Sequence, residues 1–384
     1  MTNVPAYNFN INIFILRCFG LYHDEKPSRL TKIWSYSLFF SCVLVSLLAF
    51  VQVLTEKNKD FTQLTQVLLF AAHGLTGCLK LSSFLIMGPR IKKCMQFFQK
   101  RPFVAIDDEE KRILEDCFKV CRRNVHAFGS FMVLVEVGWN FPPLFSEEYR
   151  LPMNVWLPYE HASSRLRFYT TYCYIAAVCI YLGFGSSMLE PLIGNLSYHA
   201  TSQFKLLKHN LINVVEDETE KLGNSSVVRH EKLFHRLKQC VLQHQEILYF
   251  IDEFEHCFSW SAFAQIAADT TGLCFCCVGL IMVPFPSVES TMFVICYTGQ
   301  IFQVLFYCHY GTLLYEENNG LITAIYMSSW LDCDVRLKKM LLVIMERSKA
   351  PIFLTAGKVL NLTYGTCLSV VKASCSLVSI IKQI

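Results

Sequence analysis

Four charged side chains interrupt the long apolar runs of this sequence, and they are its first candidates for chemistry: Lys80, Glu136, Asp269 and Lys372. A charged group inside a lipid bilayer is costly, so those that occur there commonly serve ion paths, proton relays or ligand recognition. No two of the four have a sequence spacing that indicates a pair, and Lys80 can extend its amine towards the headgroups. The charges therefore indicate functional positions in a membrane without indicating a reaction.

Motifs for enzymes and for nucleic-acid binding are absent from the sequence. It contains no GxSxG, no HExxH, no P-loop and no glycine-rich dinucleotide turn. The acidic run Asp107–Glu110 lies in a charge-rich segment, where a solvated face is the plainer interpretation. The basic residues follow no single stripe of the kind that binds nucleic acid. We predict that the chain is not an enzyme, has no cofactor and does not bind nucleic acid.

The eighteen cysteines lie mostly in apolar runs or in charged segments expected on the cytoplasmic side. Because disulfides need an oxidising compartment and the segments expected outside the cell contain no cysteine, we predict no disulfide. Cys274 and Cys277 form a CxxC motif, but no second pair or histidine follows at a metal-binding spacing. The motif is therefore interpreted as helix packing, and no metal centre is predicted.

Aromatic residues and a few polar groups recur in the halves of the apolar segments that are expected to lie near the outer leaflet. An apolar cavity with few polar groups is typical of small-molecule sites, although helix packing alone also explains each aromatic residue. The residues predicted to line a ligand pocket are Phe70, His73, Val133, Glu136, Trp139, Tyr169, Tyr172, Cys173, Tyr297 and Gln300.

The composition requires a membrane around these candidates. Hydrophobic residues make up 53% of the 384 residues and charged residues only 17%, and the mean hydropathy is +0.34. Soluble domains carry about 25% charged residues. Seven segments are long and apolar enough to span a bilayer, of which the third, with Glu136 inside it, is the weakest: Ile33–Leu54, Phe61–Met87, Ala127–Pro142, Phe168–Ile193, Cys257–Val283, Thr291–Tyr315 and Leu360–Ile381. We predict an all-α membrane protein with seven transmembrane helices.

The connecting segments differ sharply in positive charge. The N-terminal segment and the alternate loops hold 27 of the 35 Lys and Arg residues, whereas the opposite set holds 6. Since Lys and Arg accumulate on the cytoplasmic side, the N-terminus is predicted to be cytoplasmic and the C-terminus extracellular.

Helical periodicity extends the fourth and fifth spans into the cytoplasmic side. Apolar or semi-apolar residues from Leu233 to Phe254 recur in steps of four and three, which is typical of a helix with one packing face. We divide the chain into the segment 1–32, a six-helix bundle over 33–315 with cytoplasmic extensions near 196–256, an anchor-helix region over 316–359 and a final helix over 360–384. The alternative for the extensions is a solvated amphipathic loop helix.

The last predicted span is the candidate pore helix. Leu360–Ile381 has 22 residues and would be about 33 Å long as a helix, enough to cross a bilayer core. At helical spacing Cys375, Val378 and Ile381 share one face with Lys382 beside it. We predict that this face lines an ion pore whose apolar residues close it by dewetting.

The last fifth of the sequence resembles the sixth-to-seventh span region of insect odorant receptors. The resemblance is carried by these runs: Cys308–Gly311, Glu316-Glu317, Ala324–Tyr326, Trp330, Lys338-Lys339, Pro351, Leu354–Lys358 and Leu368–Ser376. Cys375 stands where family members often have tyrosine. The Gln-Phe that follows Thr-Tyr in the related gustatory receptors is missing after Thr363-Tyr364. The enlarged loop of the co-receptor subunit is missing too, so the chain is similar to a ligand-tuning subunit.

The resemblance implies an odorant-gated, non-selective cation channel in the plasma membrane of olfactory sensory neurons. It implies a heterotetramer with the odorant receptor co-receptor, a small volatile ligand in the outer half of the bundle, and a pore lined by the last helix of each subunit. The alternatives are a gustatory-type ligand-gated channel and a seven-span receptor that signals through G proteins. The latter would have an extracellular N-terminus, a DRY-like triplet and an NPxxY motif, and the sequence has neither motif.

Overall fold

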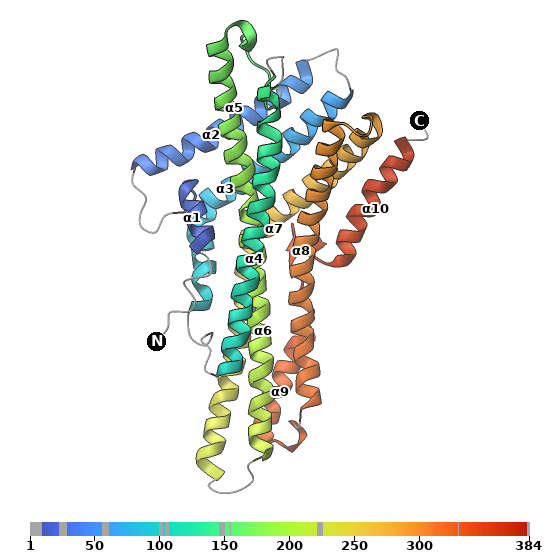
Figure 1. Cartoon of the computed structure of the whole chain (residues 1–384). Helices are drawn as coiled ribbons and strands as arrows, with labels where there is room; N and C mark the ends of the chain where they lie inside the picture. The colour runs from blue at the N-terminus through green and yellow to red at the C-terminus, as the bar shows by residue number, and fades with distance from the viewer. Residues whose placement is uncertain are drawn as a thin grey trace.

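The computed structural model describes residues 10–22, 29–55, 61–99, 103, 107–145, 150–153, 155–220, 226–328 and 330–381. Within these residues the fold is all-α, as predicted. The helices are α1 (Asn10–Cys18), α2 (Arg29–Thr55), α3 (Phe61–Gln96), α4 (Asp108–Asn140), α5 (Arg165–Ser187), α6 (Leu189–Glu220), α7 (Ser226–Met282), α8 (Val288–Met327), α9 (Val335–Ser348) and α10 (Tyr364–Ile381), with the short strands β1 (Thr355–Ala356) and β2 (Leu360–Asn361). They form an elongated bundle (Figure 1).

Five described segments are long and apolar enough to cross a bilayer, and they match five of the predicted spans: Arg29–Thr55, Val67–Gln96, Arg165–Val215, Glu231–Met282 and Ser290–Met327. The predicted span Ala127–Pro142 is the second half of α4, whose first half is charged. The predicted span Phe168–Ile193 is divided between α5 and α6, which meet at Met188.

The last predicted helix begins four residues later than expected. Leu360 and Asn361 belong to β2, which pairs with β1 in an antiparallel hairpin. The turn contains two residues with positive φ, Gly357 at 62° and Lys358 at 59°, and such backbone angles end helical geometry. The prediction of one helix over Leu360–Ile381 was therefore wrong at its start, because apolar composition does not distinguish a short hairpin from a helical turn.

The hairpin is attached to the middle of α7. The backbone N–H of Gly357 donates to the carbonyl of Ser259 at 2.8 Å, and the Ser259 hydroxyl donates to the carbonyl of Thr355 at 2.8 Å. The side chain of Phe263, one turn further along α7, lies against Gly357. The chain that leads into α10 is thus fixed to a long helix of the bundle.

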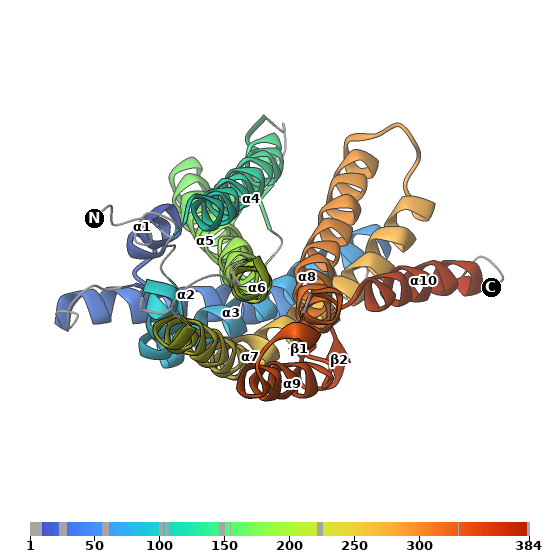
Figure 2. The ribbon, with the colours of Figure 1, turned by 90° about the horizontal axis from the view of Figure 1, so that it is seen from below.

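Helices α6 and α7 form a long antiparallel hairpin that reaches the lower end of the molecule, with α9 beside it (Figure 1). The predicted packing face of α7 is buried, including Leu237 and Ile247 at 0% exposure. Leu207 and Leu211 of α6 are buried with it in the same apolar cluster. Viewed along the bundle, α1 and α10 lie at opposite sides, and α10 projects outward beside α8 (Figure 2).

Helix α4 begins at a capping box formed within the acidic run Asp107–Glu110. The backbone N–H of Glu110 donates to the Asp107 carboxylate at 2.7 Å, and the N–H of Asp107 donates to the Glu110 carboxylate at 3.1 Å. Reciprocal bonds of this kind satisfy backbone donors that a helix start leaves unpaired. Part of the acidic run interpreted as a solvated face therefore positions a helix.

Candidate functional site

A cavity of about 210 Å³ lies between α2, α3, α4, α5, α7 and α8. Aromatic and aliphatic side chains form most of its wall, and Met153 of the loop between α4 and α5 adds to it. The polar residues on the wall are Ser46, His73, Lys80, Glu136, Ser186, Ser187, Gln265, Gln300 and Gln303. A largely apolar enclosure with a small number of polar groups is the usual form of a small-molecule site.

Five of the ten predicted pocket residues lie on this wall: Phe70, His73, Glu136, Trp139 and Gln300. The rings of Phe70 and Trp139 pack edge to face with centroids 4.5 Å apart, and the Trp139 indole N–H donates to the carbonyl of Pro152 at 3.0 Å. This bond holds the aromatic wall against the loop that carries Met153.

The other five predicted residues lie elsewhere. Val133 and Tyr169 are about half exposed, and Cys173 is exposed. Tyr172 is buried, but its hydroxyl donates to the carbonyl of Asn140. Tyr297 packs beside the cluster of Leu69, Cys276, Val283 and Phe293.

Helix phase explains these differences. On α4 the wall residues Met132, Val135, Glu136 and Trp139 follow a spacing of three and four, and Val133 falls outside it. On α5 the wall residues begin at Val178. Tyr169 to Cys173 therefore lie at least one turn beyond the cavity.

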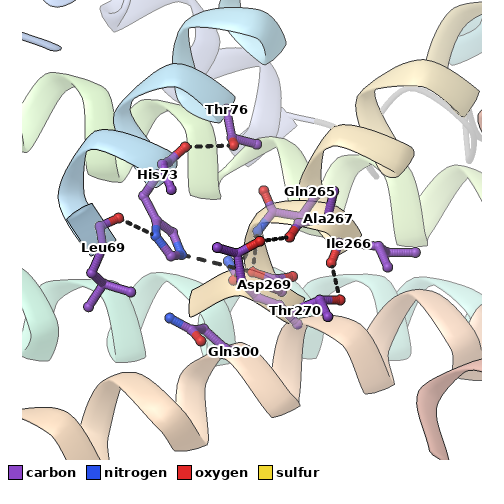
Figure 3. Close-up of polar contacts among 12 residues, drawn as sticks. Leu69, His73, Thr76, Gln265, Ile266, Ala267, Asp269, Thr270 and Gln300 are labelled. Carbon is purple, nitrogen blue, oxygen red and sulfur yellow. Dashed lines mark hydrogen bonds and ion pairs between the residues drawn. The ribbon is translucent and has the colours of Figure 1, made fainter. Parts of the chain in front are cut away.

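A polar network forms one side of the cavity (Figure 3). His73 Nε2 of α3 lies 3.9 Å from Asp269 Oδ1 of α7, and its Nδ1 is 2.9 Å from the carbonyl of Leu69. The Gln265 amide donates to Asp269 at 2.7 Å and to Gln303 of α8 at 3.2 Å. These contacts join three helices through one completely buried carboxylate.

Lys80, at the inner end of the cavity wall, makes an ion pair with Glu190 of α6. The two side chains are 3% and 0% exposed. Lys80 therefore does not extend its amine towards the headgroups, as a lysine in an apolar run can do. Sequence reasoning also missed Glu190, although the rule that selected Lys80, a charge within a predicted span, applies to it equally.

The predicted pore residues are only partly described. Cys375 is exposed on α10, whereas the side chains of Val378 and Ile381, and all of Lys382, lie outside the described residues. In the described chain, the cavity wall includes no residue of α10. Helices α7 and α8 each contribute to the cavity wall and pack against α10.

Helix α8 holds the start of α10 closely. A Cβ atom placed on Gly311 would collide with the carbonyl oxygen of Leu362. His309 Nδ1 lies 2.6 Å from the Tyr364 hydroxyl, and the backbone N–H of Tyr364 donates to the Thr312 hydroxyl at 3.3 Å. The same helix carries Gln300 and Gln303 on the cavity wall, so one rigid element touches both the cavity and the predicted pore helix.

Comparison with known proteins identifies the family. The sequence model of a family described as 7tm Odorant receptor matches residues 60–375. The chain belongs to the insect odorant receptor family. Among its relatives, Odorant receptor 22a of Drosophila melanogaster is 25% identical over 73% of this chain and 69% of its own length. Odorant receptor Or1 of Anopheles gambiae is 21% identical over 98% and 95% of the two chains.

The fold of this odorant receptor is also found among solved structures. The olfactory receptor OR5 of Machilis hrabei matches with a TM-score of 0.86 at 14% identity, over 99% of both chains. The structure of the same protein in complex with eugenol matches with a TM-score of 0.84 at 14% identity, over 96% of both chains. The family predicted from the last fifth of the sequence is confirmed. The chain is a multi-pass membrane receptor and not an enzyme.

Proposed function

We propose that this odorant receptor is the ligand-tuning subunit of an odorant-gated, non-selective cation channel, and that it binds a small volatile in the cavity of about 210 Å³. The cavity is the observation that supports this proposal most directly. An engineered protein cavity of about 150 Å³ admits benzene, so this space suits a ligand of one ring or a short chain. The related OR5 structure with eugenol supports the choice of a small aromatic class.

The wall also indicates which functional group the ligand carries. The Gln300 Oε1 atom is buried and has no hydrogen-bond partner among the described residues. A buried acceptor without a donor costs about 1–3 kcal/mol. A ligand hydroxyl that donates to this oxygen would remove that cost, so we propose a volatile alcohol or phenol over a pure hydrocarbon.

Burial of the ligand supplies the binding free energy. Removing roughly 200 Å² of apolar surface from water contributes about 5 kcal/mol before the entropy of immobilisation is subtracted. Only a difference in affinity between the closed and open bundles can shift the gate. Helix α8 is the element that supports such a shift, because it contributes Gln300 to the wall and holds Tyr364 at the start of α10.

The family and the charge distribution support a partner, an orientation and a compartment for the receptor. We propose a heteromeric assembly, a tetramer, with the odorant receptor co-receptor in the plasma membrane of olfactory sensory neurons. In it the α10 helices line the pore with Cys375, Val378, Ile381 and Lys382. The asymmetry of 27 against 6 Lys and Arg residues supports a cytoplasmic N-terminus and an extracellular C-terminus.

The test is expression of the chain in oocytes with and without the co-receptor, with currents recorded across a panel of volatiles that pairs each alcohol with its hydrocarbon. We expect inward cation currents only with both subunits, and stronger responses to the alcohols. An epitope tag at Met1 should be stained only after permeabilisation. A tag stained on intact cells, or silence across the panel with both subunits at the surface, would contradict the proposal.

A further inference from the structure

Two cysteines of α4 and a histidine of α6 meet in the interior, and none of the three lines the ligand cavity. The ligand atoms of Cys117, Cys121 and His199 all lie within 4.8 Å of one another. The three side chains are 1%, 1% and 5% exposed. They are the one group of this kind among the described residues.

Neighbouring aromatic rings and hydrogen bonds between α4 and α6 hold these three side chains in place. The His199 ring stacks on Phe98 with centroids 5.9 Å apart and lies 6.0 Å from the ring of Phe118. One turn from the cysteines, Asn195 of α6 donates to the carbonyl of Cys121 at 3.1 Å and accepts from the Asn124 amide at 2.9 Å. These bonds fix the register of α4 against α6, so the two sulfur atoms and the imidazole are positioned without help from a ligand.

We propose that Cys117, Cys121 and His199 form a structural zinc site that joins α4 to α6. Cysteines four residues apart on a helix present both sulfur atoms on one face, and with the histidine they supply three of the four ligands that a structural zinc site needs. The Ser202 hydroxyl, one turn after His199 and beside the Cys117 sulfur, stands closest to a fourth position.

The charge of the site favours zinc over a monovalent ion. Zinc binding breaks the two S–H bonds, and the two protons pass to water, so two thiolates face one divalent cation. The buried centre is then neutral. A monovalent copper ion with the same ligands would leave one negative charge buried, which is costly in an apolar surrounding.

Helix packing alone would explain two buried cysteines, because a free cysteine behaves as a small apolar side chain. The His199 ring makes a hydrogen bond with the Cys117 thiol, so the imidazole already faces a sulfur atom that would bind the metal. The sequence alone does not indicate this site, because a metal motif is recognised in sequence by a histidine near its cysteine pair. Here the histidine comes from a different helix.

The test uses the full-length receptor purified in detergent, stripped with a chelator and then dialysed against zinc sulfate. Elemental analysis should find about one zinc per chain, and the melting temperature of the unmodified chain should rise with free zinc, since a ligand of the native state stabilises it. Cobalt in place of zinc should give the visible absorption bands of a tetrahedral thiolate site.

Cys117→Ser and His199→Gln should abolish both the bound zinc and the dependence of the melting temperature on zinc. Cys240→Ser is the control, since Cys240 is equally buried but lies outside the group, and it should keep both. If a variant fails to fold, the zinc content and melting temperature of the unmodified chain still test the proposal. Absence of bound zinc together with a melting temperature that zinc does not raise would overturn the proposal, as would full zinc content in Cys117→Ser.

Discussion

Gln300 and Trp139 present different chemical groups on the cavity wall. Trp139 packs against Phe70 and supplies apolar surface, while Gln300 offers a carbonyl oxygen without a donor. In the proposed site, the apolar groups would contribute affinity in proportion to buried area, and the amide would favour ligands of similar size that donate a hydrogen bond.

Gln300→Leu should therefore weaken the response to alcohols more than the response to matching hydrocarbons. Loss of one hydrogen bond of about 1.4 kcal/mol corresponds to roughly a tenfold rise in the half-maximal alcohol concentration. Concentration–response curves with the co-receptor measure this, and Val133→Ala, which lies off the cavity, is the control. Equal shifts for both ligand classes would contradict the assigned role of the amide.

The buried ion pair of Lys80 and Glu190 affects the stability of the receptor, because each charge is balanced by the other. Lys80→Met leaves the Glu190 carboxylate without its cation, and we expect a loss of about 3–5 kcal/mol of stability. The double variant Lys80→Met, Glu190→Leu removes both charges and should recover much of that loss. Thermal unfolding and surface expression measure the difference. A double variant as unstable as the single one would show that the pair is not the relevant interaction.

At the scale of elements, the start of α4 determines where a helix with several roles begins. Asp107 caps it, and the hydrogen bond from the Glu110 N–H lowers the pKa of the Asp107 carboxyl, with the His209 ring 3.2 Å away acting in the same direction. The same helix carries Cys117, Cys121, Glu136 and Trp139. A weak start should therefore loosen the lower half of α4 first.

Asp107→Ala should lower the stability of the receptor by about 1 kcal/mol, the usual cost of losing an N-cap. Since the folded pKa is below the unfolded value of about 3.9, the charge contributes stability above that pH and loses it as the pH falls. Asp107→Asn keeps a cap without a titrating group, so it should retain most of the stability and lose this pH dependence. Melting temperatures across acidic pH values distinguish the three proteins.

At Gly311, helix α8 meets Leu362, in the segment just before α10, without room for another carbon atom. Gly311→Ala must displace the backbone at Leu362, so we expect reduced odorant-evoked current at normal surface expression. Gly320→Ala on the same helix is the matched control, since a Cβ there would meet only the Lys208 amine at 3.7 Å. Unchanged currents in Gly311→Ala would exclude this junction from gating.

At the scale of the whole molecule, composition was enough to predict an all-α membrane protein, because the apolar runs exceed what a soluble chain can bury. The periodicity between Leu233 and Phe254 also indicated the long α6–α7 hairpin. The three-dimensional contacts of single side chains could not be predicted in this way. Val133 and Tyr169 do not lie on the cavity wall, because helix phase depends on packing. The ion-pair partner of Lys80 comes from a helix far away in sequence.

The assembled channel offers a test of the pore helix. Cys375 is exposed on α10, and if that face lines the conduction path, a charged methanethiosulfonate should reduce the current of the complex. Cys375→Ser should be resistant, while Cys173→Ser, which removes an exposed thiol on α5, should remain sensitive. Equal block in both variants would place the modified thiol elsewhere.

Among the described residues, the wall of the cavity and α10 share no residue, and helices α7 and α8, which contact both, lie between them. If the proposed function holds, mutations that reshape the wall would alter which volatile is detected without changing a residue of α10. A family with this arrangement could then change its ligand preference through substitutions of a few side chains while it keeps the same helix for conduction.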